Sequence, residues 1–153
     1  GRPLNAPTGG SDRFRMIAEA HVLFYRDDQV LLLRRHGTGW HDGDYSVVAG
    51  HVDGGETIRE AACREALEEA GMRLRPEQLA FVHVVHRRSD SERLSFFFVA
   101  RDWSGEPVNT EPHKCDDLSF FPLDDLPGNM VPYVRQALAL VRDRVRYSEW
   151  GWD

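Results

Sequence analysis

Three glutamates in the middle of the sequence are spaced so that a helix would place their carboxylates on one face. Glu65, Glu68 and Glu69 occupy positions i, i+3 and i+4, and residues with this spacing are neighbours on a helical surface. Like charges so arranged destabilise an exposed helix by roughly a few tenths of a kcal/mol per pair. A hard divalent cation offsets that repulsion, and Mg2+ prefers oxygen ligands and is commonly shared with substrate phosphates. The spacing therefore favours a Mg2+ site, although three glutamates alone are equally typical of a solvated helix face.

The charge around these glutamates has the same implication. Between Gly50 and Met72 there are six acidic residues against two arginines, a local net charge of −4. Such a segment repels a polyphosphate unless a divalent cation lies between the two. The whole chain has a net charge of −6 and a pI near 5.6, whereas proteins that grip nucleic acid usually present a basic surface. We therefore expect no nucleic-acid partner.

The helix that would carry the glutamates is the best specified element of the sequence. Thr57 offers an N-cap hydroxyl, and Glu60 follows at the spacing of a capping box. Alanines recur within residues 58–70, and Gly71 can end the helix in the left-handed conformation. Arg64 has a glutamate four residues away on either side, so its guanidinium can brace these carboxylates.

The flanking segments favour β-strands. They are rich in β-branched and aromatic residues and are separated by turn-forming residues, which is typical of strands. The predicted strands are Ile17–Tyr25, Gln29–Arg35, Tyr45–Val48, Ala80–Arg87, Leu94–Arg101 and Leu118–Phe121. A second helix is predicted from Pro132 to about Tyr147, where apolar residues recur every three or four positions. This order predicts an α/β fold in which helices cover a mixed sheet.

The chain has the length of one domain. Its 153 residues are expected to comprise a flexible leader over residues 1–13, a single domain over 14–147 and a C-terminal tail over 148–153. No apolar run approaches the roughly 20 residues that cross a bilayer, and no secretion signal is recognisable. The two cysteines, Cys63 and Cys115, are expected to be reduced thiols. We therefore expect a cytoplasmic protein without a membrane partner.

Seven residues in and around the predicted helix form a longer pattern. They are Gly50, Glu56, Arg64, Glu65, Glu68, Glu69 and Gly71. Their spacing, Gly-x5-Glu-x7-Arg-Glu-x-x-Glu-Glu-x-Gly, resembles the Nudix box, and every fixed residue type of that motif is present. Ala66 stands where a bulkier aliphatic residue is usual, and Val48 stands where relatives often carry a proline. The likeness extends over about residues 17–140, but only the box is specific.

The resemblance implies a Nudix fold, which is an α/β/α sandwich with a mixed β-sheet and a loop-helix-loop catalytic motif. The metal ligands that it implies are Glu65, Glu68, Glu69 and the backbone carbonyl of Gly50. Glu56 and Arg64 would orient this set and belong with the glutamates to the catalytic residues. The cofactor would be Mg2+, with Mn2+ as a substitute, and water would attack a phosphorus of a nucleoside diphosphate-linked substrate. The general base differs among members of the family, and Glu65 is the first candidate here.

The sequence leaves the substrate open. Residues 111–116 and 120–124 are similar to a segment of members that cleave nucleoside triphosphates. The leading hypothesis is hydrolysis of a (d)NTP or oxidised (d)NTP to the monophosphate and pyrophosphate. The alternatives are cleavage of ADP-ribose or a nucleotide-sugar, or a catalytically silent Nudix domain that senses a ligand. The partner would be a small nucleotide, bound by a monomer or a homodimer.

Several residues outside the box have competing interpretations. Further substrate-binding candidates are Arg34, Glu111 and Tyr133, of which Glu111 could instead be an extra metal ligand or the base. His83 and His86 lie three apart on a predicted strand and so face opposite sides, which argues against a zinc site. The loop over residues 36–44, with Trp40, could close over a base or simply pack. The aromatic residues of the tail could cap the domain or join a partner.

Overall fold

The computed structural model describes residues 13–153, so almost all of the expected flexible leader lies outside the described residues. The strands are β1 (Ile17–Arg26), β2 (Gln29–Arg35), β3 (Tyr45–Ser46), β4 (Val48–His51), β5 (Leu79–Arg88), β6 (Glu92–Ala100), β7 (Cys115–Pro122) and β8 (Tyr147–Trp150). The helices are α1 (Ile58–Ala70), α2 (Pro132–Arg142) and the short 3-10 helix η1 (Pro76–Gln78). No helix among these residues is long and apolar enough to span a membrane.

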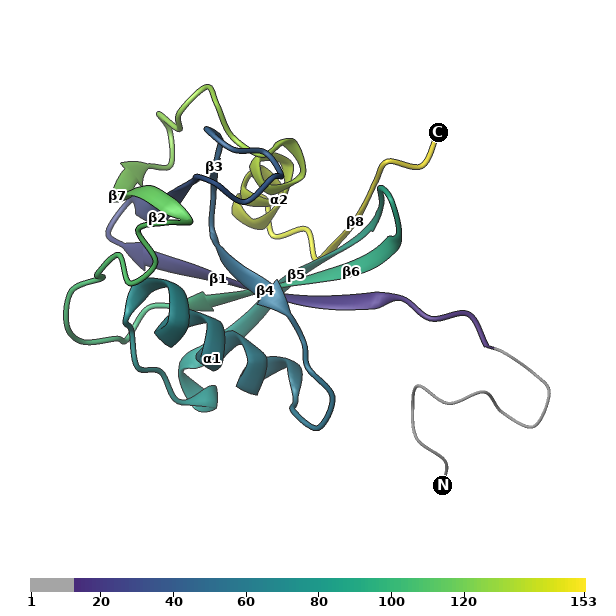
Figure 1. The fold of residues 1–153 in the computed structure, drawn as a ribbon, viewed down its shortest axis with the longest axis horizontal. Coiled ribbons are helices and arrows are strands. Elements are labelled where there is room, and N and C mark those ends of the chain that lie inside the picture. The colour runs from purple at the N-terminus through teal and green to yellow at the C-terminus, as the bar shows by residue number, and fades with distance from the viewer. Residues whose placement is uncertain (1–12) are drawn as a thin grey trace.

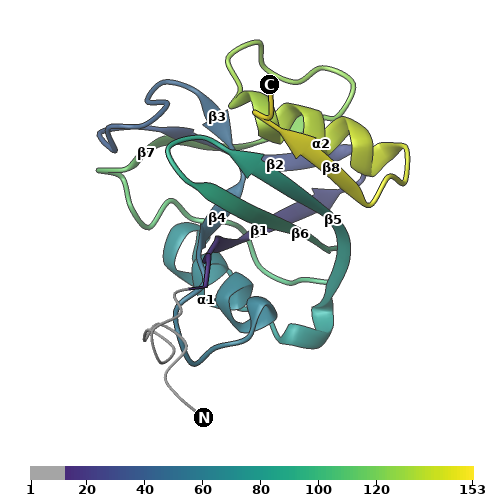
Figure 2. The same cartoon turned by 90° about the vertical axis from the view of Figure 1, so that its right-hand side faces the viewer.

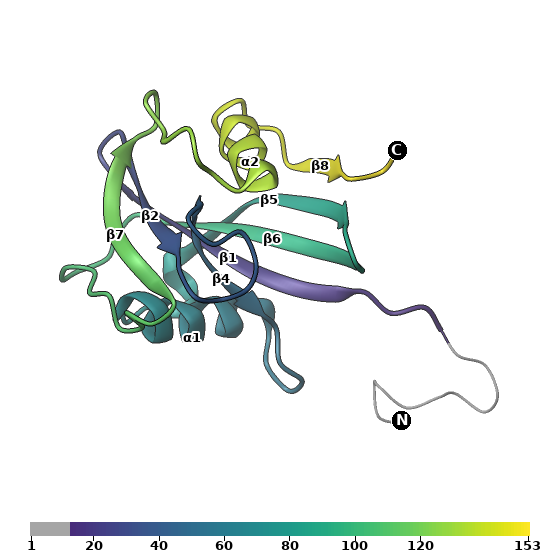
Figure 3. The same ribbon diagram turned by 45° about the horizontal axis from the view of Figure 1, so that its top comes forward.

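The strands form one mixed sheet between two helices. The main order is β3-β2-β1-β6-β5-β8, with β4 paired to β1 and β7 paired to β2. Strand β1 runs parallel to β6 and antiparallel to β2 and β4. Helix α1 lies on one face of this sheet and α2 on the other (Figures 1 and 3). The chain therefore has the α/β/α sandwich that the box predicts.

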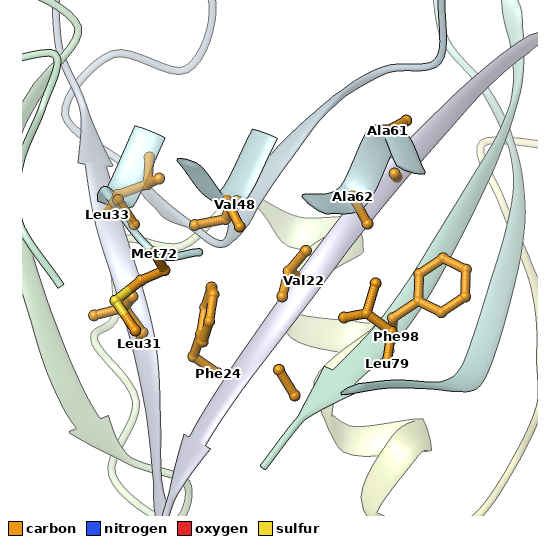
Figure 4. Close-up of a cluster of buried hydrophobic side chains, with 14 of the residues drawn as sticks. Val22, Phe24, Leu31, Leu33, Val48, Ala61, Ala62, Met72, Leu79 and Phe98 are labelled. Atoms are coloured by element: carbon orange, nitrogen blue, oxygen red, sulfur yellow. The ribbon is translucent and has the colours of Figure 1, made fainter. Parts of the chain in front are cut away.

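Alternate side chains of β1 pack into two hydrophobic cores, one on each face of the sheet. Ala20, Val22 and Phe24 pack in the cluster that contains the buried residues of α1, shown in Figure 4. Leu23 and Tyr25 belong to the cluster that contains the buried residues of α2. Successive side chains of a strand point to opposite faces, so a strand with helices on both sides is apolar at nearly every position. This double burial fixes the orientation of both helices against the sheet.

The predicted helix over residues 58–70 is confirmed, with both of its expected ends. The backbone N–H of Glu60 donates to Thr57 Oγ1 over 3.0 Å, and the N–H of Thr57 donates to Glu60 Oε1 over 2.8 Å. Gly71 adopts the left-handed conformation with φ of 63° and donates to the carbonyl of Leu67 over 3.1 Å. The side of α1 that faces the sheet consists of alanines, and Ala66 is fully buried there. A small residue in place of a bulky aliphatic one lets the helix lie close to the strands.

The prediction that the last helix reaches about Tyr147 is wrong. Helix α2 ends at Arg142, and Arg144 adopts a left-handed φ of 59°. The chain then forms β8, which pairs in parallel with β5 at the edge of the sheet (Figure 2). Apolar spacing alone cannot reveal this turn, because β8 is stabilised by contacts with a distant strand.

A buried histidine supplies the contact that holds β8. His83 is fully buried, and its ring nitrogens bond the Val145 carbonyl over 2.7 Å and the Ser148 hydroxyl over 2.8 Å. A buried imidazole strongly favours having both nitrogens bonded, so the segment after α2 is drawn to β5. Residues 147–150 therefore continue the sheet across the expected boundary between domain and tail.

The capping box predicts a measurable contribution to stability. Substitution of Thr57 with alanine removes the side-chain acceptor for the N–H of Glu60 and should lower the free energy of unfolding by about 1 kcal/mol. Urea denaturation at neutral pH measures this change. Thr57→Ser keeps the hydroxyl and should retain most of the stability. Equal losses in the two variants would show that the methyl group of Thr57, and not its cap, is responsible.

Candidate active site

A cleft of about 920 Å³ opens along the edge of α1 and reaches across the sheet. Strands β1, β2, β4, β5 and β6 contribute to its lining, together with both long helices and the loops around residues 37–40 and 111–114. Elements far apart in the sequence therefore meet around one cavity. Its side chains fall into an acidic group on α1 and a basic group on the strands.

The guanidinium of Arg64 organises the acidic side of the cleft. Its Nη1 donates to Glu65 over 2.7 Å and to Glu68 over 3.0 Å. Its Nε and Nη2 donate to Glu56 over 3.2 and 2.7 Å, and Nη2 also donates to the His51 carbonyl over 2.9 Å. The hydrogen bonds to Glu56, then to the two helix glutamates, raise the pKa of Arg64 above its ordinary value. One side chain thus fixes the loop before the helix and two helix carboxylates in a single arrangement.

The backbone of β4 lies directly against the glutamates of α1. A Cβ atom added to Gly50 would stand 2.2 Å from the carboxyl carbon of Glu65, so no other residue type fits without displacing that carboxylate. The N–H of Ala49 donates to Glu69 over 3.3 Å. Strand β4 and the carboxylates of Glu65 and Glu69 are therefore in direct contact.

This group holds more negative charge than its protein partners neutralise. Burial, followed by the hydrogen bond and charge of Glu65 and the charge of Glu111, raises the pKa of Glu69 well above its ordinary value. Glu68 is turned toward Arg64, and within residues 13–153 no three His, Cys, Asp or Glu side chains are arranged as a formed metal site. Excess carboxylate charge beside a glycine carbonyl nevertheless fits a hard divalent cation.

A second charged group lies across the cleft, on strands β1, β5 and β6. Glu19 accepts from Arg87 over 2.8 and 3.1 Å, from Arg93 over 2.9 Å and from the Ser95 hydroxyl over 2.8 Å. Burial opposes the charged form of Glu19, but the charge of His21, then the charge and hydrogen bond of Arg87 and the hydrogen bond of Ser95, outweigh that effect and lower its pKa to about 2. The strand pairing creates this group, because Glu19 lies opposite Ser95, and Arg87 opposite Arg93.

Sequence reasoning did not identify this second group. The available signal was Glu19 and His21, two polar residues at alternate positions of a strand that is otherwise apolar. Alternate positions share a face, so such a pair indicates a polar site within a buried sheet. Its partners Arg87 and Arg93 come from strands whose register the sequence does not give.

Tyr133 of α2 lines the cleft beside these arginines. Its hydroxyl and the Nε2 atom of the fully buried His21 are 2.8 Å apart, and the Arg87 guanidinium lies 4.1 Å from the centre of its ring. Burial lowers the pKa of His21 to about 4 and raises the pKa of Tyr133. The imidazole is therefore neutral at physiological pH and acts as a hydrogen-bonding group.

Most of the sequence-predicted site residues converge on this cleft. Those that line it are Gly50, Glu65, Glu68, Glu69, Glu111 and Tyr133, while Arg64 and Glu56 lie behind the glutamates. Arg34 is not among the lining residues and instead pairs with Asp116 over 2.6 Å. Its neighbour Arg35 lines the cleft and donates to the Trp40 carbonyl over 2.7 Å. Leu33 and Arg35 both line the cleft and lie two positions apart on β2, so strand alternation turns Arg35 toward the cleft and Arg34 away from it.

Comparison with known proteins gives a consistent assignment. The profile of the NUDIX domain family matches residues 15–141. The chain is 30% identical over 152 residues to the NAD-capped RNA hydrolase NudC of Chromobacterium violaceum, covering 95% of this chain and 54% of that protein. It is 26% identical to the uncharacterized Nudix hydrolase YvcI of Bacillus subtilis, covering 80% of this chain and 81% of that protein. The chain thus spans about half the length of the NudC relative.

A solved structure agrees in both fold and sequence. The MutT NUDIX hydrolase from Burkholderia pseudomallei superimposes with a TM-score of 0.75 at 29% identity, covering 82% of this chain and 98% of that one. The two chains therefore share their fold over nearly the whole length of the Burkholderia pseudomallei protein.

Because His21 is buried, we expect the free energy of unfolding to be sensitive to acid. Its pKa is about 4 when folded and near 6.5 in the reference state, so between these pH values the unfolded chain binds more protons. The free energy of unfolding should therefore fall as pH falls through this window, by about 3 kcal/mol. Chemical denaturation from pH 7 to pH 4 should show that His21→Asn loses this part of the slope. The exposed His36 is the control, and His36→Asn should keep the slope; equal slopes for His21→Asn and the unsubstituted protein would contradict the assignment.

Proposed function

The chain belongs to the Nudix hydrolase family, and from this premise we propose that it hydrolyses a (d)NTP or oxidised (d)NTP to the nucleoside monophosphate and pyrophosphate. One observation carries the proposal, namely that a single cleft has an acidic side and a basic side. The acidic side is Glu65, Glu68 and Glu69 of α1, and the basic side is Arg87 of β5 and Arg93 of β6. A polyphosphate can meet the first only through a divalent cation and the second by direct charge-assisted hydrogen bonds.

The acidic side is proposed to hold Mg2+, with Mn2+ as a substitute. Its ligands would be Glu65, Glu68, Glu69 and the Gly50 carbonyl, and Glu56 and Arg64 would orient them. The close approach of Gly50 to the Glu65 carboxylate supports this set, because the backbone of β4 lies within reach of an ion held by the glutamates. When bound, such an ion lowers the pKa of a coordinated water and offsets charge on the phosphoryl group.

Proton removal from the attacking water needs a carboxylate within reach of the reacting phosphorus. We propose Glu65 for this role, because Arg64 and Gly50 hold its side chain at one position on the cleft wall. Glu111 is the competing candidate, since it lines the same cleft from the loop before β7 and has only a weak ion pair with Lys114 at 3.9 Å. Glu111→Gln should leave most of the turnover if Glu65 is the base.

A dinucleotide or other two-part substrate is the second candidate. The cleft of about 920 Å³ lies near the upper end of the range of roughly 300–1,000 Å³ for small-molecule sites. The NudC relative is named as a hydrolase of NAD-capped RNA, which also carries a diphosphate between two moieties. The size of the cleft therefore supports a ligand with a group on each side of the scissile diphosphate.

A substrate panel with Mg2+ tests the proposal. It contains canonical and oxidised dNTPs, ADP-ribose, nucleotide-sugars, NAD and dinucleoside polyphosphates, with chromatographic separation of the products. We expect triphosphates to yield monophosphate and pyrophosphate, and Glu69→Gln to abolish turnover. Preference for ADP-ribose, NAD or a sugar nucleotide would replace the triphosphate as substrate. Metal binding without turnover of any compound would indicate a ligand-sensing domain.

A pair of glycine substitutions tests the geometry of the catalytic group. Gly50→Ala should reduce turnover by roughly 100-fold, because its methyl group displaces the Glu65 carboxylate, and errors of about 1 Å have effects of this size. Gly54→Ala is the matched control, since an added Cβ there meets nothing within 4 Å. Steady-state kinetics with circular dichroism separates catalysis from folding. Equal activity in the two variants would contradict the placement of Gly50 in the catalytic group.

A further inference from the structure

We propose that Arg87 and Arg93 form a metal-independent phosphate subsite on the basic side of the cleft, held in its binding geometry by Glu19. The inference rests on the proposed function and deepens it, because it assigns a second oxyanion contact to the substrate. One phosphate would bind through a metal ion held by the box carboxylates of α1. Another phosphate of the same ligand would bind the guanidinium pair directly. The ligand class is therefore a nucleotide with an anionic group beyond the one at the metal.

The hydrogen bonding of Arg87 indicates a position prepared for a ligand. Its side chain is only 7% exposed, and it donates through Nε to Ser95 over 3.0 Å and through Nη2 to Glu19. Among residues 13–153, Nη1 has no hydrogen-bond acceptor, although Arg87 lines the cleft. Nη1 is not one of the buried side-chain atoms that lack a partner, so this charged donor is open to the cleft. An oxyanion in the cleft would satisfy it.

Arg93 adds a second guanidinium without a matching negative charge. It lies opposite Arg87 in the β5–β6 pairing, and both side chains share the single carboxylate of Glu19. Its other acidic neighbour, Asp90, is 3.4 Å away and 82% exposed, so solvent screens that pair. The group formed by two arginines and Glu19 carries a net charge of +1 in a largely buried setting, which favours an anion.

Glu19 acts as a positioning residue in this subsite. It is buried and accepts hydrogen bonds from both arginines and from Ser95, so the protein itself occupies its hydrogen-bonding capacity, although Glu19 also lines the cleft. Its effect is to fix the two guanidiniums before the ligand arrives. Side chains that are already ordered lose less conformational entropy on binding, and a guanidinium pair matches the oxygens of a phosphate.

The subsite is connected to the catalytic group through one residue. The ring of His51 accepts a hydrogen bond from Arg93 over 3.0 Å, and its backbone carbonyl accepts one from Arg64 over 2.9 Å. His51 directly follows Gly50, whose carbonyl is the proposed metal ligand. The phosphate subsite and the box carboxylates therefore lie on the two sides of β4 in the same cleft, which is the arrangement that a ligand with more than one phosphate requires.

Binding of inorganic pyrophosphate in EDTA tests the subsite apart from catalysis. Titration followed by 31P NMR at low salt should show binding to the unsubstituted protein, weakened about tenfold or more in Arg87→Gln, as expected for a lost charge-assisted contact. Arg75→Gln is the matched control, because Arg75 is 71% exposed and pairs with Glu77 away from the cleft. Glu68→Gln should lose hydrolysis but keep metal-free binding. Circular dichroism checks the fold of each variant.

Arg93→Gln is the second variant, and its side chain is more exposed than that of Arg87, so it covers the case in which Arg87→Gln does not fold. The inference is overturned if pyrophosphate does not bind in EDTA. It is also overturned if folded Arg93→Gln or Arg87→Gln binds pyrophosphate as tightly as the unsubstituted protein does. A third contradicting outcome is that the affinity depends on these arginines only for a nucleoside without phosphate. Binding that persists in EDTA while no substrate is hydrolysed with Mg2+ would contradict the proposed function but leave the subsite intact.

Discussion

The placement of one guanidinium, that of Arg64, underlies the architecture of the site. Helix α1 brings several carboxylates together beside a strand, and their mutual repulsion would by itself drive the helix and the preceding loop apart. Arg64 prevents this by bonding Glu56 in the loop, two glutamates of the helix and the carbonyl of His51. Hydrophobic packing places α1 on the sheet, and Arg64 adds the polar contacts that hold the carboxylates beside β4, where Gly50 closely approaches Glu65.

The same principle recurs across the cleft with the signs reversed. There a single carboxylate, Glu19, holds two arginines and a serine, as Arg64 holds several carboxylates. A buried charge with several partners tolerates the loss of one poorly, because the remaining groups keep their desolvation cost. His51 joins the two groups, since its carbonyl contacts Arg64 and its ring contacts Arg93. The two groups are therefore directly connected at the place where the charge of the cleft changes sign.

The sequence predictions succeeded where an element depends on contacts between neighbouring residues, and they failed where it depends on residues far apart in the sequence. The limits of α1 were predictable because Thr57 and Gly71 act on their own neighbours, and the box residues lie within or beside that one helix. Strand β8 was missed because it depends on His83, which bonds residues more than 60 positions away. Arg34 is not among the residues that line the cleft, whereas Leu33 and Arg35 are; alternation separates the two faces of β2, but which face meets the cleft depends on how distant elements pack against it.

The two sides of the cleft differ in the same way, because one is formed by residues close together in the sequence and the other by residues far apart. The acidic side of the cleft is encoded by one contiguous segment, so any chain that forms the helix and its caps presents the carboxylates in the same way. The basic side requires β1, β5 and β6 to pair in the observed register, because Glu19, Arg87 and Arg93 meet only then. Substitutions on these strands can change which anion or base is bound while Arg64 keeps the proposed catalytic group unchanged. A fold of this kind can therefore acquire new substrates without rebuilding its reaction centre.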